Sequence, residues 1–251
     1  MNIDSAWRAT KQESSRFSFQ TSDFNSTNLK YKDTIRAIFF DNWFPKIDKK
    51  RAIVDTVSMT SLNRSIQLFK TASSQKFDLL YNYDLRGLGP GEVLLYLIVN
   101  GSYLGGGSSA ASDLIIGSST YEIKSSKRNV GGGFYHDFRF GKTIDDDAIK
   151  GELLALGKKS NLISRSTNNN SSLAIPGTKM KEIADKNKEE FESIEKRYSS
   201  IVKKYLGNTS LVVFDRTDGL IKFSEKGNSF KENDVGIYRI ATGTIEPLIR
   251  V

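Results

Sequence analysis

The residues whose types and spacing could do chemistry are an acid, Asp113, and a Glu-x-Lys pair that follows nine residues later, Glu122 and Lys124. They lie within or directly beside two short strand-like runs, 114–116 and 121–123, which are joined through a Gly-Ser-Ser turn. Side chains alternate along a strand, so Glu122 and Lys124 share one face. If the two runs pair as an antiparallel hairpin, Asp113 comes to the end of the neighbouring strand, close to both. The spacing therefore predicts that two carboxylates and one ammonium group converge.

This set of groups suits phosphodiester hydrolysis assisted by a hard cation. Mg²⁺ prefers a few carboxylate oxygens and leaves its other positions to water and phosphate. Asp113 and Glu122 could supply those oxygens, the backbone carbonyl of Ile123 could add a third ligand, and Mn²⁺ is expected to substitute. Lys124 would lie beside the attacking water, where its charge favours hydroxide and stabilises the transition state. The lysine is expected to act as a positioned charge more than as a base.

A second acid, Glu92, follows the glycine-rich run 87–91 and leads the apolar run 93–99. Pro90 and Gly91 before that run predict a turn that feeds the first turn of a buried helix. The helix dipole favours an acid at that position, so a capping role is one interpretation of Glu92. The other interpretation is that Glu92 faces the metal across the sheet.

The order Gly-x-Gly-x-Gly-Glu92, then Asp113, then Glu122-x-Lys124, resembles the PD-(D/E)xK nuclease superfamily over about residues 85 to 128. The resemblance implies a metal site made of these four side chains. It also implies an α/β fold of the restriction-endonuclease-like type, in which a central mixed sheet is flanked by helices. Two departures are visible. Ser112 stands where such proteins often have proline, and the expected first strand before Asp113 is short or lies partly in 96–99.

The rest of the chain predicts elements around such a core. Apolar spacing predicts helices over 33–44, 61–69 and 143–157, one long amphipathic helix over 176–206, and a strand over 211–215. We expect one nuclease-like domain over 1–251, with a core of about 76–215. Residues 1–75 would form an N-terminal helical and arm elaboration, and 216–251 a β appendage of short C-terminal strands.

The charge balance favours an anionic partner. Lys and Arg number 37 against 29 Asp and Glu, which gives a net charge of +8, and DNA is the expected partner. Lys127, Arg128 and Arg139 surround a triple glycine and are expected to position phosphate, although a glycine-rich turn between strands is an equal interpretation. His136, the only histidine in the chain, is interpreted as a structural residue more readily than as a ligand.

Several function classes are excluded or disfavoured. The chain has no cysteine, so a disulfide framework, a cysteine-based zinc site and thiol catalysis are excluded. The N-terminus has no secretory pattern, and the longest apolar run, 93–99, is too short to span a membrane. We therefore expect a cytoplasmic protein of a bacterium, or of a virus that acts inside its host cell. A homodimer is an open alternative to a monomer.

Three functions remain as hypotheses. The leading one is a Mg²⁺-dependent endonuclease of restriction, repair or viral DNA-processing type. The second is a nucleic-acid-binding or virion-associated structural protein that keeps the nuclease fold with little or no cleavage. The third is a non-nuclease enzyme or an assembly subunit. The motif would then be a coincidence, since Glu and Lys are common on exposed strand edges, and Asp113 and Glu122 would lie on opposite sides of the molecule.

Overall fold

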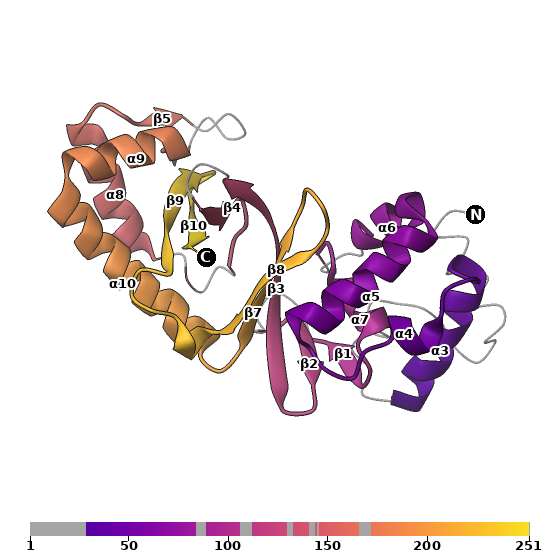
Figure 1. Cartoon of the computed structure of the whole chain (residues 1–251). Coiled ribbons are helices and arrows are strands. Elements are labelled where there is room, and N and C mark those ends of the chain that lie inside the picture. Colours follow the sequence, from indigo (N-terminus) through magenta and orange to yellow (C-terminus); the bar gives the residue numbers. More distant parts are fainter. Residues whose placement is uncertain are drawn as a thin grey trace. The chain divides into compact units, whose positions relative to one another are not determined.

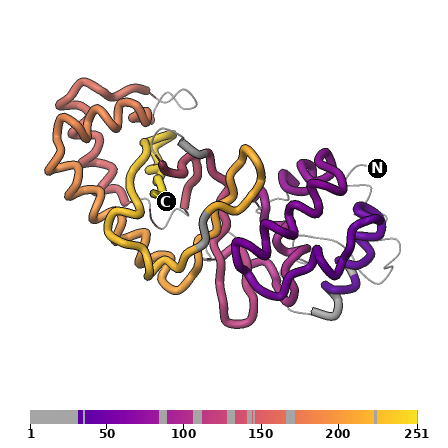
Figure 2. Tube along the Cα trace, in the orientation of Figure 1, coloured from indigo at the N-terminus to yellow at the C-terminus, as the bar shows by residue number. Residues whose placement is uncertain are grey.

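The computed structural model describes residues 29–83, 89–105, 112–129, 133–140, 144, 146–165 and 172–250. The chain divides into two compact units (Figures 1 and 2). The first comprises Met1–Ser125 and Thr209–Ser224, and the second comprises Ser126–Asn208 and Glu225–Val251. The predicted core of 76–215 is thus shared between the two units. The predicted N-terminal arm lies outside the described residues.

The first unit begins with helices. They are α3 (Leu29–Trp43), α4 (Lys49–Ala52), α5 (Met59–Ala72), α6 (Ser74–Tyr81) and α7 (Glu92–Ile98). Side chains cap three of them in the expected way, because Asp48, Ser58 and Ser73 accept hydrogen bonds from first-turn amides of α4, α5 and α6. The predicted helices over 33–44 and 61–69 are therefore confirmed; the first begins earlier and ends one residue earlier, and the second is longer at both ends.

Aromatic side chains hold these helices together. The ring of Phe69 on α5 lies 4.9 Å from that of Phe44 and 5.5 Å from that of Phe40, measured between centroids. Trp43 and Phe39 are fully buried in the same cluster. Edge-on and tilted rings at these distances are the favoured geometry for aromatic pairs. The cluster forms one core with the apolar helix α7.

The strands of the first unit form the predicted hairpin. β1 (Ser102–Leu104) pairs antiparallel with β2 (Leu114–Ile116), which pairs antiparallel with β3 (Ser119–Asn129). Gly117 has a φ of 56°, a left-handed conformation that suits glycine in a tight turn. β3 also pairs with β7 (Ser210–Asp215), and β7 pairs with β8 (Ile221–Lys226). The hairpin, the short first strand and the strand over 211–215 are thus confirmed.

The second unit is an antiparallel sheet flanked by helices. The end of β3 pairs with β4 (Phe134–His136), β4 with β10 (Thr244–Arg250), and β10 with β9 (Val235–Ala241). The helices are α8 (Asp147–Lys159), α9 (Gly177–Lys186) and α10 (Lys188–Leu206), and they lie beside these strands in Figure 1. A short 3-10 turn η2 (Gly227–Ser229) and the pair β5 (Ser164–Arg165) and β6 (Leu173–Ala174) complete the unit. The fold class is therefore mixed α/β.

Two expectations for this region need correction. The segment 176–206 is two helices and not one, because the backbone of Asn187 leaves the helical region at φ −131° and ψ 50°. The Asn187 side chain donates to the Ile183 carbonyl and to Ser160, and these bonds hold the break. The C-terminal strands are also more than an appendage, because β10 pairs with β4 and so belongs to the sheet of the second unit.

A buried lysine joins α3 to the far end of α7. The ammonium group of Lys32 donates to the Val99 carbonyl at 3.2 Å and to the Ser102 hydroxyl at 2.6 Å, and also to the Ser102 carbonyl. It lies 4.3 Å from the centroid of the Tyr96 ring. Burial, followed by the charge of the neighbouring Arg36, lowers the pKa of Lys32 to about 7. The carbonyl groups at the end of α7 thus receive a cation, as the helix dipole favours.

Lys32 makes the free energy of unfolding depend on pH. Between a folded-state pKa of about 7 and the ordinary value of 10.5, the unfolded chain binds the proton that the folded chain has lost, so stability rises with pH. In urea unfolding, the free energy of unfolding of wild type should therefore rise by on the order of 2 kcal/mol relative to that of Lys32→Met between pH 7 and pH 9. Lys76→Met is the control, since Lys76 also donates to a carbonyl and lies over a ring but is half-buried. An equal pH dependence in both variants would contradict the assignment.

Candidate active site

The hairpin fixes the backbone of Asp113 from both sides. Its amide donates to the Tyr121 carbonyl of β3 at 2.8 Å, and its carbonyl accepts from the Gly105 amide, just after β1, at 3.0 Å. Asp113 therefore stands between two strands with its backbone hydrogen bonds made inside the sheet. Its side chain is left to point at the opposite stretch of β3.

The three side chains predicted to converge do so. The ammonium nitrogen of Lys124 lies 2.6 Å from Oε1 of Glu122 and 3.4 Å from Oδ2 of Asp113. Oδ2 of Asp113 also accepts a hydrogen bond of 2.7 Å from the Ile123 amide. The lysine thus bridges an acid on β3 and the acid that directly precedes β2, so Asp113 and Glu122 do not lie far apart, as the third hypothesis expected them to.

The shielding of this cluster from water is uneven. The Glu122 side chain is 3% exposed, that of Lys124 16% and that of Asp113 22%. Charges interact more strongly where water is excluded, so the contact between Glu122 and Lys124 is the stronger of the two ion pairs. Asp113 keeps the widest access to solvent. A ligand that approaches the cluster would meet Asp113 first.

Burial and charge set the protonation of the cluster. Burial opposes the charge on Lys124, but Asp113 and Glu122 outweigh it and raise the pKa of Lys124 above its ordinary value. Burial raises the pKa of Glu122; Lys124 opposes this rise and Asp113 adds to it. Lys124 is therefore a permanent cation near neutral pH and cannot accept a proton there.

Glu92 is the first residue of α7, where the capping interpretation places it, and the charges of the cluster act on it. Its Oε1 accepts a hydrogen bond of 2.8 Å from the Gly89 amide, just before α7. The side chain is buried, and burial raises the pKa of Glu92 to about 8, with Asp113 as the next cause. The charges of Asp113, Lys124 and Glu122 all act on the pKa of Glu92. The capping bond and a role beside the cluster are thus compatible.

The glycines before Glu92 have a physical reason. Gly91 adopts φ 86°, which is unfavourable for other residues, and a Cβ there would lie 2.9 Å from the ring of Phe214. This conformation lets the chain turn directly into α7, with Glu92 as its first residue. The glycine run therefore places the acid through a tight turn against β7.

The carboxylate oxygens of the cluster fit a divalent cation in part. Oε2 of Glu122 is buried and has no hydrogen-bond partner among the described residues, so one carboxylate oxygen is left for a ligand. Over the same part of the chain, no three side chains of His, Cys, Asp or Glu are grouped as a metal-binding cluster. Mg²⁺ is usually bound by only one or two carboxylates and keeps several waters. Asp113 and Glu122 therefore fit a partial cage, to which the Ile123 carbonyl could add; among the described residues, the predicted further ligand Glu92 is not grouped with these two acids.

The sequence did not predict that Tyr81 and Arg216 would contact the residue next to Lys124. Ser125, next to Lys124, shares a hydrogen bond of 2.6 Å with the Tyr81 hydroxyl, and its carbonyl accepts from Arg216 at 2.9 Å. These contacts tie β3 to α6 and to the segment after β7. The partners lie 44 and 91 residues away along the chain, so no local pattern could have indicated them.

The predicted phosphate-positioning residues lie on β3 and in the second unit. Lys127 is 62% exposed and lies 3.4 Å from Asp137. Arg139 is bound to the buried Glu246 at 3.0 Å and to the Thr242 hydroxyl at 2.9 Å. Arg128 belongs to β3, opposite Tyr135, but its side chain lies outside the description. Of the three, Lys127 has the side chain most open to a ligand among those described.

Removing Lys124 should destabilise the protein through the acids that it leaves behind. In Lys124→Ala, Glu122 and Asp113 would face one another without a cation, so unfolding free energy should fall by on the order of 2–4 kcal/mol at pH 8. The loss should be smaller at pH 5, because burial raises the pKa of Glu122 and its protonation removes the repulsion. Chemical unfolding at both pH values measures it. Lys222→Ala, which breaks a more exposed pair with Asp218 in the same unit, should change little. Similar losses in the two variants would contradict the analysis.

Comparisons with protein-family models, with curated proteins and with solved structures found no match to this chain. Its function is therefore inferred from its own residues and their geometry.

Proposed function

We propose that this chain is a metal-dependent nuclease that hydrolyses phosphodiester bonds of DNA, with Asp113, Glu122 and Lys124 at its active site. The observation that carries the proposal is the bridge that Lys124 makes between an acid on β3 and the acid that directly precedes β2, at 2.6 Å and 3.4 Å. A buried ion triad contributes little to stability compared with apolar packing, so stability alone is a weak reason to build one. A catalytic role would explain why Asp113, Glu122 and Lys124 lie together.

The chemistry assigns each residue a task. A bound Mg²⁺ ion would polarise the scissile phosphate and favour ionisation of the attacking water. Asp113 and Glu122 would hold that ion, through Oε2 of Glu122 and the outward side of Asp113, with the Ile123 carbonyl as a further candidate. Mn²⁺ should substitute, because it also accepts carboxylate oxygens.

Lys124 serves the reaction as a charge. In hydrolysis a water oxygen forms a bond to phosphorus and its proton passes to solvent, while the bond to the leaving deoxyribose oxygen breaks and that oxygen takes up a proton from solvent. Negative charge grows on the phosphoryl oxygens during this step, and a fixed ammonium group stabilises it. Because its two acids raise the pKa of Lys124, the lysine keeps its proton throughout. Asp113 and Glu122 hold the ammonium group in place before substrate binds.

The charge of the chain supports an anionic substrate. The net charge of +8 would attract a polyanion and raise its local concentration. The finer assignment, an endonuclease of restriction, repair or viral DNA-processing type, is part of the proposal. Among the described residues, no helix is both long enough and apolar enough to cross a membrane.

Cleavage assays test the site directly. Purified protein should cut supercoiled plasmid with Mg²⁺ or Mn²⁺ and not with EDTA, and a linear duplex in parallel would separate endonuclease from exonuclease action. Asp113→Asn, Glu122→Gln and Lys124→Ala should each lower the rate by at least about a hundredfold. Asp218→Asn is the matched control, since Asp218 is also a lysine-paired acid of the first unit.

The mutants also separate roles within the site. Lys124→Ala should keep most metal affinity, whereas Asp113→Asn should weaken metal binding measured by calorimetry. Full activity in any of the three site variants would refute the proposed site. If wild type cuts neither the plasmid nor the linear duplex but binds DNA in a salt-sensitive way, the protein is instead a nucleic-acid-binding or structural module.

A further inference from the structure

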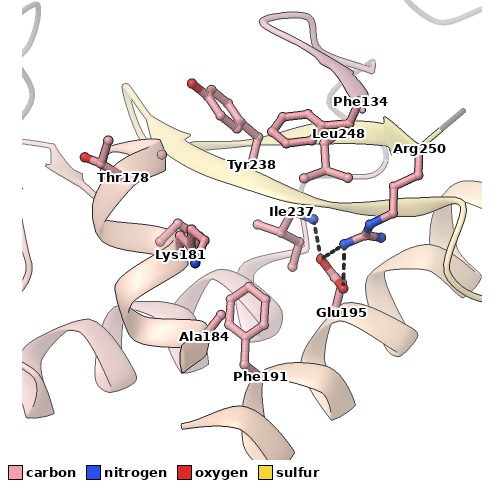
Figure 3. A pocket seen from close by; sticks show the side chains of 12 residues that line it. Phe134, Thr178, Lys181, Ala184, Phe191, Glu195, Ile237, Tyr238, Leu248 and Arg250 are labelled. Carbon is pink, nitrogen blue, oxygen red and sulfur yellow. Dashed lines mark hydrogen bonds and ion pairs between the residues drawn. The ribbon is translucent and has the colours of Figure 1, made fainter. Parts of the chain in front are cut away.

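A cavity of about 550 Å³ lies within the second unit, between the helices α9 and α10 and the strands β4, β9 and β10 (Figure 3). This volume is in the range of sites that take small organic groups. Its floor is apolar, formed by the buried side chains Met180, Phe191, Ile237 and Leu248. Every lining residue belongs to the same unit, so the cavity is a property of that unit alone.

Aromatic rings border the cavity. Phe134 on β4 and Tyr238 on β9 both line it, with their ring centroids 5.9 Å apart. His136 stacks on Tyr238 at 4.0 Å with an angle of 28° between the ring planes. All three side chains are half-buried. We call Phe134, His136 and Tyr238 the aromatic ledge; half-exposed rings beside a cavity are suited to stack on another flat ring.

The aromatic ledge is held in place by its surroundings. A Cβ on Gly177 would lie 2.7 Å from the Tyr238 ring, so the ring packs directly on the backbone at the start of α9. On β9 the guanidinium of Arg239 lies 5.6 Å from the centroid of the same ring. Arg239 is itself fixed by ion pairs with Glu246 at 2.6 Å and Asp137 at 2.9 Å. A preorganised ring loses little entropy when a ligand binds.

The charges around the cavity favour an anion over a neutral ligand. Glu195, the acid in its wall, is neutralised by Arg250, which lies 3.1 Å from both of its oxygens (Figure 3). Lys181 at the rim is 79% exposed and is held only by a surface pair with Asp185, of a kind that contributes little. The second unit carries 20 Lys and Arg against 15 Asp and Glu.

A further lysine lies beside the aromatic ledge. Lys127 on β3 stands directly opposite His136 on β4 in the antiparallel register. Residues directly opposite one another on neighbouring strands project from the same face of the sheet. The side chain of Lys127, 62% exposed, is therefore on the face that carries the ledge. Rings flanked by lysines match a ligand that has both a flat face and a phosphate.

We propose that this cavity and the aromatic ledge bind an unpaired base of single-stranded nucleic acid, with its flanking phosphates near Lys181 and Lys127. An apolar peptide or a second copy of the chain would use the apolar floor, but neither would need the flanking cations. The choice of DNA as the strand rests on the proposed nuclease function. The cavity itself does not depend on that function.

The test measures binding without cleavage. The full chain with Glu122→Gln, in EDTA, is titrated with a fluorescein-labelled strand of about 12 thymidines and followed by anisotropy. Phe134→Ala and Tyr238→Ala should each weaken binding by about 5- to 100-fold, since a base stacked on an aromatic ring is lost. Tyr238→Phe keeps the ring and should bind like the parent. Lys181→Ala should weaken binding less and reduce its dependence on salt.

The controls separate ring loss from structural damage. Tyr205→Ala removes another half-buried aromatic side chain of the second unit, away from the cavity, and should leave binding unchanged. If the alanine variants unfold, Phe134→Leu and Tyr238→Leu keep apolar volume, remove the rings and should show the same loss. Folded ring variants with parental affinity would overturn the proposal. So would a dimer that dissociates in these variants while affinity for the strand is unchanged, since the cavity would then belong to a second copy.

This test and the test of the nuclease proposal fail separately. Ring-dependent binding by a protein that cuts no DNA would keep the binding site and remove the nuclease. Metal-dependent cutting with ring-independent binding would do the reverse.

Discussion

The first unit depends on one arrangement of charge, an ammonium group held between two carboxylates inside a sheet. Burial and the neighbouring Asp113 both raise the pKa of the Glu122 carboxyl, and Lys124 is the group that opposes them. The hairpin makes this arrangement possible by fixing Asp113 through backbone hydrogen bonds on both sides, so that its position does not depend on its own charge. Packing of α7 on the same core then brings Glu92 into the field of the triad.

Local sequence was informative where geometry is set by neighbours in the chain. Alternation along β3 and the Gly117 turn were enough to predict that Glu122, Lys124 and Asp113 would meet, because the register of a two-residue hairpin follows from its turn. The glycine before Glu92 likewise indicated a turn, and its left-handed conformation is the physical reason.

Where distant segments meet, the sequence was silent. The contact of Ser125 with Tyr81 and Arg216 joins three separate parts of the chain, and the stacking of His136 on Tyr238 joins residues about 100 apart. The break at Asn187 was also hidden, because amphipathic spacing continues through it on both sides and the side-chain bond to Ser160 comes from another helix. Apolar periodicity reports the face that a helix buries, and it does not report whether the axis is continuous.

The strand β3 belongs in part to each of the two units. β3 carries Glu122 and Lys124 in the first unit and continues into the second, where Lys127 faces His136. Since side chains alternate with a period of two, the parity of this single strand decides which residues face which side in both places. A one-residue insertion between Tyr121 and Glu122 would therefore turn Glu122 and Lys124 to the opposite face of β3, away from Asp113, while the pairing of Tyr121 with Leu114 stays in register.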